Sequence, residues 1–381
     1  MVASRLAPFG STVFTEISAA AAAHGAVDLG QGYPSWEGPG FVKEAAIAAI
    51  RERSNQYPPS NGVPELRRAI AERWFADTGM AIDPEAEVTV TSGCTEALAA
   101  TFLGLFEPGD EVVLFEPAYD AYPVGCALSG AVPRYVTLRA PDFRFSVAEL
   151  VAAVGPRTRA ILVNTPHNPT GRVLDAAEME AIAALARAHD LVVITDEVYE
   201  RIVYEGTHLR MATLPGMWER TLTLSSIGKS FSLTGWKTGW AIGPKPLTAA
   251  VRAAHQFLTF TTPNPMQHGA AAALGAPQTY YEDLVDSYRG RRDLLVSGLA
   301  ELGFELRPPE GSYYVLADHT RFGFEDDGSF VRHLITEIGV AAIPPSSFYH
   351  GSDEGFRLVR FAFCKDERVL TQALERLQVL G

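Results

Sequence analysis

Residues 225–240 read Ser-Ser-Ile-Gly-Lys-Ser-Phe-Ser-Leu-Thr-Gly-Trp-Lys-Thr-Gly-Trp. They follow an alternating apolar run, Thr221–Leu224, which predicts a strand. Lys229 thus comes just after a strand end, in a Gly-, Ser- and Thr-rich loop without a nearby carboxylate. Burial of an unpaired ammonium is costly and lowers its pKa from about 10.4, which makes the amine a nucleophile suited to Schiff-base chemistry. An exposed loop lysine is the alternative, and the other strand ends decide between the two.

This stretch closes a longer alternation of short apolar runs and helical patterns between about Val88 and Gly243. Strand–helix alternation predicts an α/β fold with a mostly parallel sheet and helices on both faces. The near-continuous apolar strands indicate burial on both sides. Strands are expected at 87–91, 111–115, 159–163, 191–195 and 221–224, and helices at 96–106 and 176–189.

The C-terminal third has a different pattern, which predicts a smaller α+β domain. A long helical pattern at 281–302 precedes short strands at 312–316 and 356–363. The N-terminal segment is too short to fold alone, and we expect it to pack with this domain. With 381 residues favouring two domains, we predict a large domain at 41–280 and a small domain at 1–40 and 281–381.

Composition restricts the function classes. The chain is 47% hydrophobic and 20% charged, with a formal net charge of -13. The acidic balance argues against nucleic-acid and anionic-membrane partners but leaves room for a small anionic ligand in a local basic pocket. Three cysteines fit neither a metal site nor a disulfide framework, and no signal peptide is visible, so we expect a cytoplasmic protein.

The remaining strand ends were compared as a set, because ligands of open α/β sheets bind beyond the carboxyl ends of the strands. Thr-Ser-Gly-Cys-Thr-Glu at 91–96 opens a helix, whose free N–H groups suit a phosphate. Helix capping by Thr95 and Glu96 explains the same residues. Tyr119, after the second strand, can stack on a planar ring or pack as wall.

Two further ends carry polar groups. The loop Asn-Thr-Pro-His-Asn-Pro-Thr-Gly at 164–171 is stiffened by X-Pro pairs and would hold Asn168 as a donor to a ring oxygen, although turn chemistry also explains it. Asp196 ends an apolar strand, where it needs a cationic or N–H partner. A pyridinium N–H would serve, and a structural salt bridge is the alternative. Tyr199 could hydrogen-bond the same ring oxygen.

Ser226 and Lys237 complete the set near Lys229. Lys237 supplies a second positive charge, which suits a phosphate better than a second covalent attachment, and an exposed lysine is the alternative. Together the strand ends provide an anion cradle, a ring stack, a carboxylate, oxygen donors and an amine nucleophile. Pyridoxal phosphate needs these groups.

On these residues the chain resembles the class I, fold-type-I aminotransferases, which use pyridoxal 5′-phosphate. Motifs at 168–171, 195–199, 226–240 and 359–363 carry a resemblance that covers almost the whole chain. It implies covalent attachment of the cofactor to Lys229, a salt bridge from Asp196 to the ring nitrogen, and stacking by Tyr119. It also implies contacts to the ring oxygen from Asn168 and Tyr199.

The resemblance further implies a phosphate site and a homodimer with shared active sites. The phosphate would be held by Ser226, Lys237 and the amides of Cys94 and Thr95, and by Tyr57 reaching across from a partner subunit. Many relatives carry Arg where Lys237 stands, so this contact is reduced to a point charge.

For the substrate, the resemblance implies that Arg360 clamps the α-carboxylate, a role suited to a bidentate fork, rather than being a surface arginine. The backbone of Gly32 would approach the substrate. Phe14 stands where kynurenine aminotransferases have a tryptophan, and Thr261 where they have a histidine. Aromatic candidates for the pocket wall predict aromatic or unbranched apolar donors: Phe14, Tyr33, Phe260 and Phe348.

The motifs at 29–34 and 55–59 look most like those of the kynurenine, glutamine, methionine and N-succinyldiaminopimelate aminotransferases. The predicted activity is ping-pong transfer of an amino group from such an L-amino acid to a 2-oxo acid such as 2-oxoglutarate, with Lys229 as the general base. A cysteine-S-conjugate β-lyase would use the same residues and is the alternative. A cofactor-sensing regulator would need a DNA-binding domain, for which residues 1–39 are too short.

Overall fold

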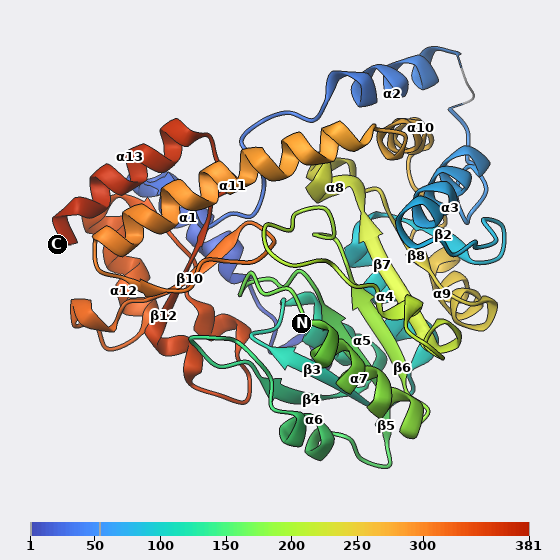
Figure 1. The fold of residues 1–381 in the computed structure, drawn as a ribbon, viewed down its shortest axis with the longest axis horizontal. Coiled ribbons are helices and arrows are strands. Elements are labelled where there is room, and N and C mark those ends of the chain that lie inside the picture. Colours follow the sequence, from blue (N-terminus) through green and yellow to red (C-terminus); the bar gives the residue numbers. More distant parts are fainter. Residues whose placement is uncertain (1, 53–54, 381) are drawn as a thin grey trace.

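The computed structural model describes residues 2–52 and 55–380, and a seven-stranded sheet forms its centre (Figure 1). The strand order is β2-β8-β7-β6-β5-β3-β4. Neighbours from β4 to β7 run parallel, whereas β8 is antiparallel to both β7 and β2. The predicted mostly parallel sheet is therefore confirmed. The strands are β2 (Val88–Thr91), β3 (Glu111–Glu116), β4 (Val132–Thr137), β5 (Thr158–Asn164), β6 (Val192–Asp196), β7 (Thr221–Ser226) and β8 (Gly239–Ile242).

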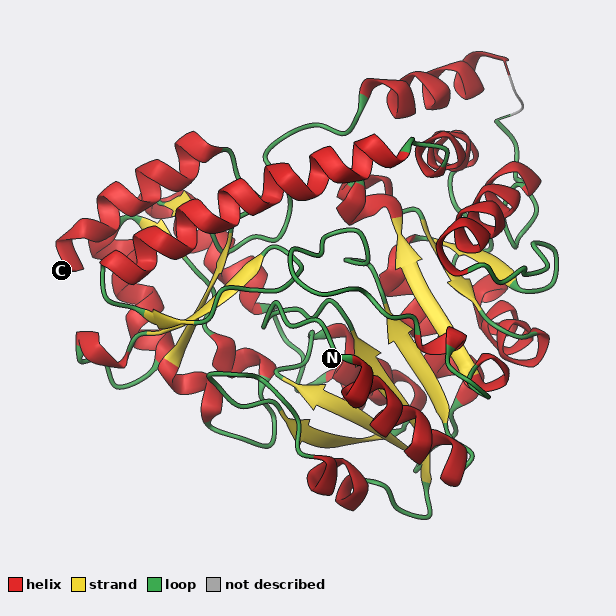
Figure 2. Cartoon of the chain, in the orientation of Figure 1, coloured by secondary structure: helices red, strands yellow, loops and turns green. Residues whose placement is uncertain are grey.

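Helices cover both faces of this sheet (Figure 2). One core joins the strands to α4 (Gly93–Leu105), α5 (Ala121–Ser129) and α9 (Lys245–Leu258). The opposite core involves α6 (Val147–Ala153) and α7 (Ala176–Ala188). A third joins β2 and β8 to α2 (Gly40–Glu52), α3 (Pro64–Thr78) and α10 (Asn264–Leu274). Burial on both sides explains the near-continuous apolar sequences of β3, β5 and β6.

The sequence patterns missed two strands of this sheet and misplaced one residue. β4 is an edge strand with exposed positions, where Pro133 is tolerated because the outer side needs no ladder hydrogen bond. β8 is short and begins at a glycine. Lys229 was expected in a loop, but it lies in the one-turn helix α8 (Ile227–Ser230), which directly follows β7. This turn carries the amine back toward the strand ends.

The C-terminal third contributes a three-stranded antiparallel sheet in the order β12-β10-β9: β9 (Glu305–Leu306), β10 (Tyr314–Asp318) and β12 (Leu358–Ala362). The helices α12 (Asp327–His333) and α13 (Glu367–Leu377) pack with it. The long helix α11 (Gln278–Glu301) runs from the α10 side of the molecule toward α13 (Figure 1). The domain boundaries themselves stay predictions.

The N-terminal segment packs beside this small sheet. After α1 (Val13–His24), the short strand β1 (Val27–Asp28) pairs in parallel with β11 (Val340–Ala341). The Leu29 carbonyl accepts a hydrogen bond from the Ala362 amide at 2.7 Å. Residues 30–33 are thereby held across the ends of the large sheet. Within the described ranges, no helix is long and apolar enough to cross a membrane.

Candidate active site

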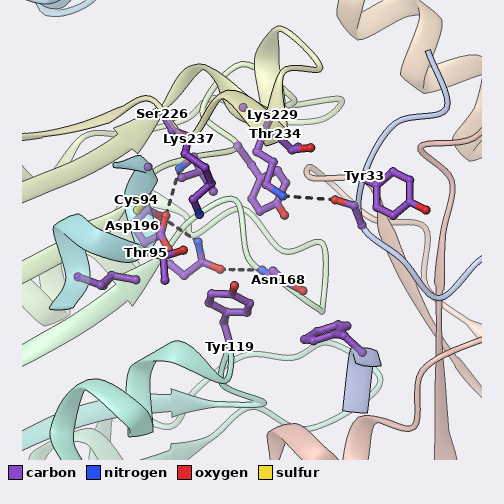
Figure 3. A pocket seen from close by; sticks show the side chains of 18 of the residues that line it. Tyr33, Cys94, Thr95, Tyr119, Asn168, Asp196, Ser226, Lys229, Thr234 and Lys237 are labelled. Atoms are coloured by element: carbon purple, nitrogen blue, oxygen red, sulfur yellow. Dashed lines mark hydrogen bonds between the residues drawn. The ribbon is translucent and has the colours of Figure 1, made fainter. Parts of the chain in front are cut away.

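A cavity of about 260 Å³ opens at the carboxyl ends of the strands, where in-register pairing brings Asn164 beside Asp196 (Figure 3). Most of the predicted site residues line it. They are Phe14, Gly32, Tyr33, Cys94, Thr95, Tyr119, Asn168, Asp196, Tyr199, Ser226, Lys229 and Lys237. Convergence of parallel strand ends is the reason that residues scattered along the sequence meet here.

Lys229 reaches into this cavity without a carboxylate partner. Its Nζ donates to the Gly32 carbonyl at 3.3 Å and lies 5.7 Å from the ring centres of Tyr199 and Tyr313. Among the described residues none forms an ion pair with it. Burial lowers the Lys229 pKa, and nearby Cys364 and Asp196 oppose this only in part. The amine is therefore more easily deprotonated than an ordinary lysine, as nucleophilic chemistry requires.

Asp196 is a buried carboxylate with neutral donors around it. Its Oδ2 accepts from the Tyr122 hydroxyl at 2.9 Å and its Oδ1 from the Val198 amide at 3.3 Å, while the Cys94 thiol also hydrogen-bonds it. Burial raises the Asp196 pKa, and these donors together with Lys229 offset this in part. The structural salt bridge considered as the alternative is not formed within the described chain. A cationic ligand is the missing partner.

The neighbouring carboxylate, Glu197, makes that salt bridge instead. It is fully buried and accepts from Arg210 at 2.6 Å, His208 at 2.9 Å and Thr195 at 2.9 Å. Burial alone would raise the Glu197 pKa, but Arg210 and His208 outweigh it, and the pKa is lowered. The sequence analysis did not single out this residue.

The walls of the cavity suit a planar ring. Tyr119 packs edge-to-face on Tyr122 with ring centres 5.7 Å apart. The Tyr199 hydroxyl lies 3.2 Å from that of Tyr314. Gly32 is needed opposite them, because a Cβ there would lie 1.8 Å from the Tyr314 hydroxyl oxygen. The backbone can approach a ligand closely only with glycine at this position.

An anion site lies at the other end of the cavity. The first turn of α4 supplies Gly93, Cys94 and Thr95, and the φ of Gly93 is +75°. A Cβ on Gly93 would lie 3.3 Å from the Lys237 amine, so this cation sits against the N-terminus of the helix. The helix dipole and the ammonium together favour a phosphate, and Ser226 lines the same end. Amine, unpaired carboxylate and anion cradle therefore fit pyridoxal phosphate.

Arg360 is buried beside the cavity, so the surface-arginine alternative is wrong. Its guanidinium donates to Asn168 Oδ1 at 3.2 Å and to the Gly30 carbonyl at 2.7 Å, and its buried Nε has no partner among the described residues. The rings of Phe14, Tyr314 and Phe348 lie 4.3–5.3 Å from it. Because Asn168 Oδ1 is held, the amide N–H₂ of Asn168 is left to face a ligand oxygen.

Besides Arg360, three predicted residues do not line the cavity. Tyr57 is 82% exposed and packs edge-to-face against Phe260, itself 45% exposed, with ring centres 5.5 Å apart. Neither lines the cavity of its own chain. Phe348 is buried and acts on the site through its contacts with Arg360 and Phe14.

Sequence reasoning missed several lining residues. Tyr122 lies in the first turn of α5, three positions after Tyr119, whose carbonyl accepts a hydrogen bond from the Tyr122 amide at 3.0 Å. Asn164 had a strand-end position as its signal. Its Nδ2 donates to the Asp196 carbonyl at 2.9 Å and its Oδ1 accepts from the Asn168 amide at 2.7 Å. Tyr314 comes from the small sheet, and no pattern in the sequence points to it.

The chain is similar to known proteins along almost its whole length. Residues 25–377 match the family described as aminotransferase class I and II. The chain is 47% identical to a probable N-succinyldiaminopimelate aminotransferase of Mycobacterium tuberculosis, over 100% of this chain and 99% of the relative. It is 40% identical to the methionine aminotransferase of Escherichia coli, over 99% and 98%. The solved structure of N-succinyldiaminopimelate aminotransferase from M. tuberculosis superposes with a TM-score of 0.97 at 48% identity, covering 100% of both chains.

Proposed function

We propose a substrate class for this chain, which belongs to the class I and II aminotransferases and is therefore a pyridoxal-phosphate-dependent enzyme. It transfers the amino group of an L-amino acid whose side chain is uncharged next to the α-carbon to a 2-oxo acid such as 2-oxoglutarate, by a ping-pong mechanism. N-succinyl-LL-diaminopimelate, methionine, glutamine and aromatic amino acids such as kynurenine all fit this description.

The cavity lining supports this class. Aromatic rings form much of the wall, and among the residues that the structure describes the only cations lining it are Lys229 and Lys237, both of which have roles at the cofactor. A short side-chain carboxylate such as that of aspartate would meet no further cation among the described residues that line the cavity. Desolvating such a charge without a partner is unfavourable.

Each side chain has a role set by its position. Bound pyridoxal phosphate supplies an electron sink for the substrate's α-carbon. Arg360 binds the α-carboxylate, and Asn168 and Tyr199 donate to the ring oxygen. Asp196 holds positive charge at the ring nitrogen, which stabilises the negative charge that develops at the α-carbon. Lys229 would act as the general base that takes the α-proton of the substrate on its Nζ.

We also propose a cytoplasmic homodimer with shared active sites. Tyr57 would contact the phosphate in the partner's pocket. Its exposure, together with the exposed Phe257 (85%) and Phe260 (45%), supports a covered surface here in the dimer. The three unpaired cysteines fit a reducing compartment.

A donor screen against 2-oxoglutarate tests the substrate class. The expected result is high kcat/KM for one of N-succinyl-LL-diaminopimelate, methionine, glutamine or kynurenine, and low kcat/KM for aspartate. A strong preference for aspartate would contradict the proposal, because the described part of the cavity lining offers no further cation for that side chain.

The β-lyase alternative has separate products. The relatives reported above are named as aminotransferases, and their names give it no support. Pyruvate release from a cysteine S-conjugate, without any 2-oxo acid present, would reveal it. The proposal expects this rate to stay well below that of transamination.

A further inference from the structure

A buried histidine outside the cavity makes hydrogen bonds through both ring nitrogens. His255, on α9, places Nδ1 2.7 Å from Glu96 Oε1 and Nε2 2.8 Å from the Ser60 carbonyl. The histidine is fully buried and Glu96 is nearly so. A carbonyl oxygen only accepts, so Nε2 carries a hydrogen, and the short Nδ1–Oε1 contact needs another. The pair therefore holds one proton more than a neutral histidine beside a carboxylate.

This pair connects two segments that matter for the site. The Glu96 Oε2 accepts from the Ser92 amide at 2.7 Å, and Ser92 directly precedes the turn of α4 that lines the anion end of the cavity. On the other side, Ser60 belongs to residues 56–63, which also carry Tyr57. This segment is fixed to the sheet by a hydrogen bond from the Val90 amide to the Asn61 carbonyl at 3.1 Å.

We propose that His255 is a positioning residue for the anion end of the pocket, and that the proton it shares with Glu96 fastens the first turn of α4 to residues 56–63. It acts through Glu96 and touches no ligand itself. The inference rests on the proposed function only in taking the anion to be the phosphate of the cofactor. The tie itself depends on the contacts of His255 alone.

The surroundings determine when the shared proton is held. Glu96 faces His255 from α4, Arg252 acts on it from the same helix, and Thr259 Oγ1 lies 3.4 Å from Nδ1. Burial alone would lower the His255 pKa, but the hydrogen bond and charge of Glu96, aided by the Ser60 carbonyl, outweigh it and raise the pKa above 6.5. The stabilisation is therefore fully present below this ordinary value and is lost as pH rises through the raised pKa.

Glu96→Gln is the informative substitution. A glutamine can accept from the Ser92 amide and donate to Nδ1 of a neutral His255, so it keeps both contacts without the extra proton. The experiment measures binding of inorganic phosphate to the cofactor-free protein, and its thermal midpoint, between about pH 7 and about pH 10. Wild type should lose roughly fivefold more phosphate affinity across this range than Glu96→Gln, which corresponds to one hydrogen bond. His255→Gln should bind phosphate weakly throughout.

Several outcomes would overturn the proposal. If phosphate affinity and thermal midpoint change equally with pH in wild type and Glu96→Gln, the shared proton is contradicted. A slope difference in thermal midpoint but not in phosphate affinity would make the tie structural only. If Glu96→Gln does not fold, the proton NMR signal of wild type that His255→Gln lacks still decides, since the absence of a proton signal between Nδ1 and Glu96 at about pH 7 contradicts the pair. Phosphate binding without amino-group transfer would contradict the proposed function alone.

Discussion

The two carboxylates at the end of β6 are adjacent in sequence and both buried, yet they face different surroundings. Asp196 faces the cavity, where a tyrosine hydroxyl, a backbone amide and a thiol surround it, and its pKa is raised. Glu197 faces away, where Arg210 and His208 pair with it, and its pKa is lowered. On the far side, Glu197 has cationic partners within the described chain. On the cavity side, Asp196 forms no ion pair with a described residue.

The contrast between Asp196 and Glu197 shows how a binding site can be distinguished from a structural ion pair. A buried carboxylate that only neutral groups solvate is unfavourable unless a cation arrives from outside. Lys229, whose charge acts on Asp196, has a lowered pKa and is needed as a free amine. The protonated ring nitrogen of the cofactor completes the cavity side.

The largest expected effect is that of Lys229→Ala. The variant should fold, but kcat should fall by on the order of 10⁴-fold or more, because both the nucleophile and the general base are lost. Steady-state transamination assays measure this, and Lys245→Ala, at an exposed lysine that does not line the cavity, is the matched control. Near-wild-type turnover of Lys229→Ala without added amines would refute the assignment.

Asp196→Asn and Glu197→Gln test the difference between the two carboxylates directly. Asp196→Asn should lower kcat by roughly 10²- to 10³-fold with the fold retained, because charge stabilisation at the ring is lost. Glu197→Gln should instead lower the free energy of unfolding by about 3 kcal/mol, because it leaves Arg210 with a weakened buried partner. Chemical denaturation and kinetics on both variants separate these effects. Equal losses of stability would mean that the two sides do not differ.

Arg360→Lys should cost about 10- to 100-fold in kcat/KM, since a lysine cannot reproduce the planar fork that binds a carboxylate. The loss should be similar for every amino donor, because the α-carboxylate is common to all of them. A loss confined to one donor would place Arg360 at the side chain of the substrate instead.

Tyr122→Phe tests how much its hydroxyl stabilises the Asp196 carboxylate on the cavity side. Loss of the hydrogen bond to Asp196 should cost about 1.5 kcal/mol, or roughly tenfold in kcat. The pH at which the absorbance of the bound cofactor changes should also rise. The reason is that a less strongly stabilised Asp196 carboxylate supports less positive charge on the ring nitrogen. An unchanged transition would show that Tyr122 is only packing.

The smallest effects concern the pH dependence of the cofactor-free protein. The lowered pKa of Glu197 contributes stability at neutral pH that is lost as pH falls through its folded pKa. The raised pKa of Asp196 has the opposite sign, so unfolding should become relatively harder as this group protonates. Thermal midpoints against pH should therefore lie above wild type for Asp196→Asn and below it for Glu197→Gln, converging in acid.

Sequence predicted the cavity side well, because parallel strands deliver their carboxyl ends to one place. Lys229, Asp196 and Asn168 could be located from strand ends alone. Tyr314 could not, because it arrives from the small sheet, and the pairing of β10 with β12 is not visible in a single sequence. Glu197 lacked a visible partner, since Arg210 comes from an irregular segment. The strand β8 was too short to show a pattern.

One measurement tests directly whether the cofactor attaches covalently to Lys229 and not to Lys237. Borohydride reduction of the cofactor-loaded protein fixes any covalent attachment, and mass spectrometry of its peptides then locates the modified residue. We predict a single pyridoxyl adduct on Lys229. An adduct on Lys237, or a protein that binds the cofactor without any adduct, would contradict this account.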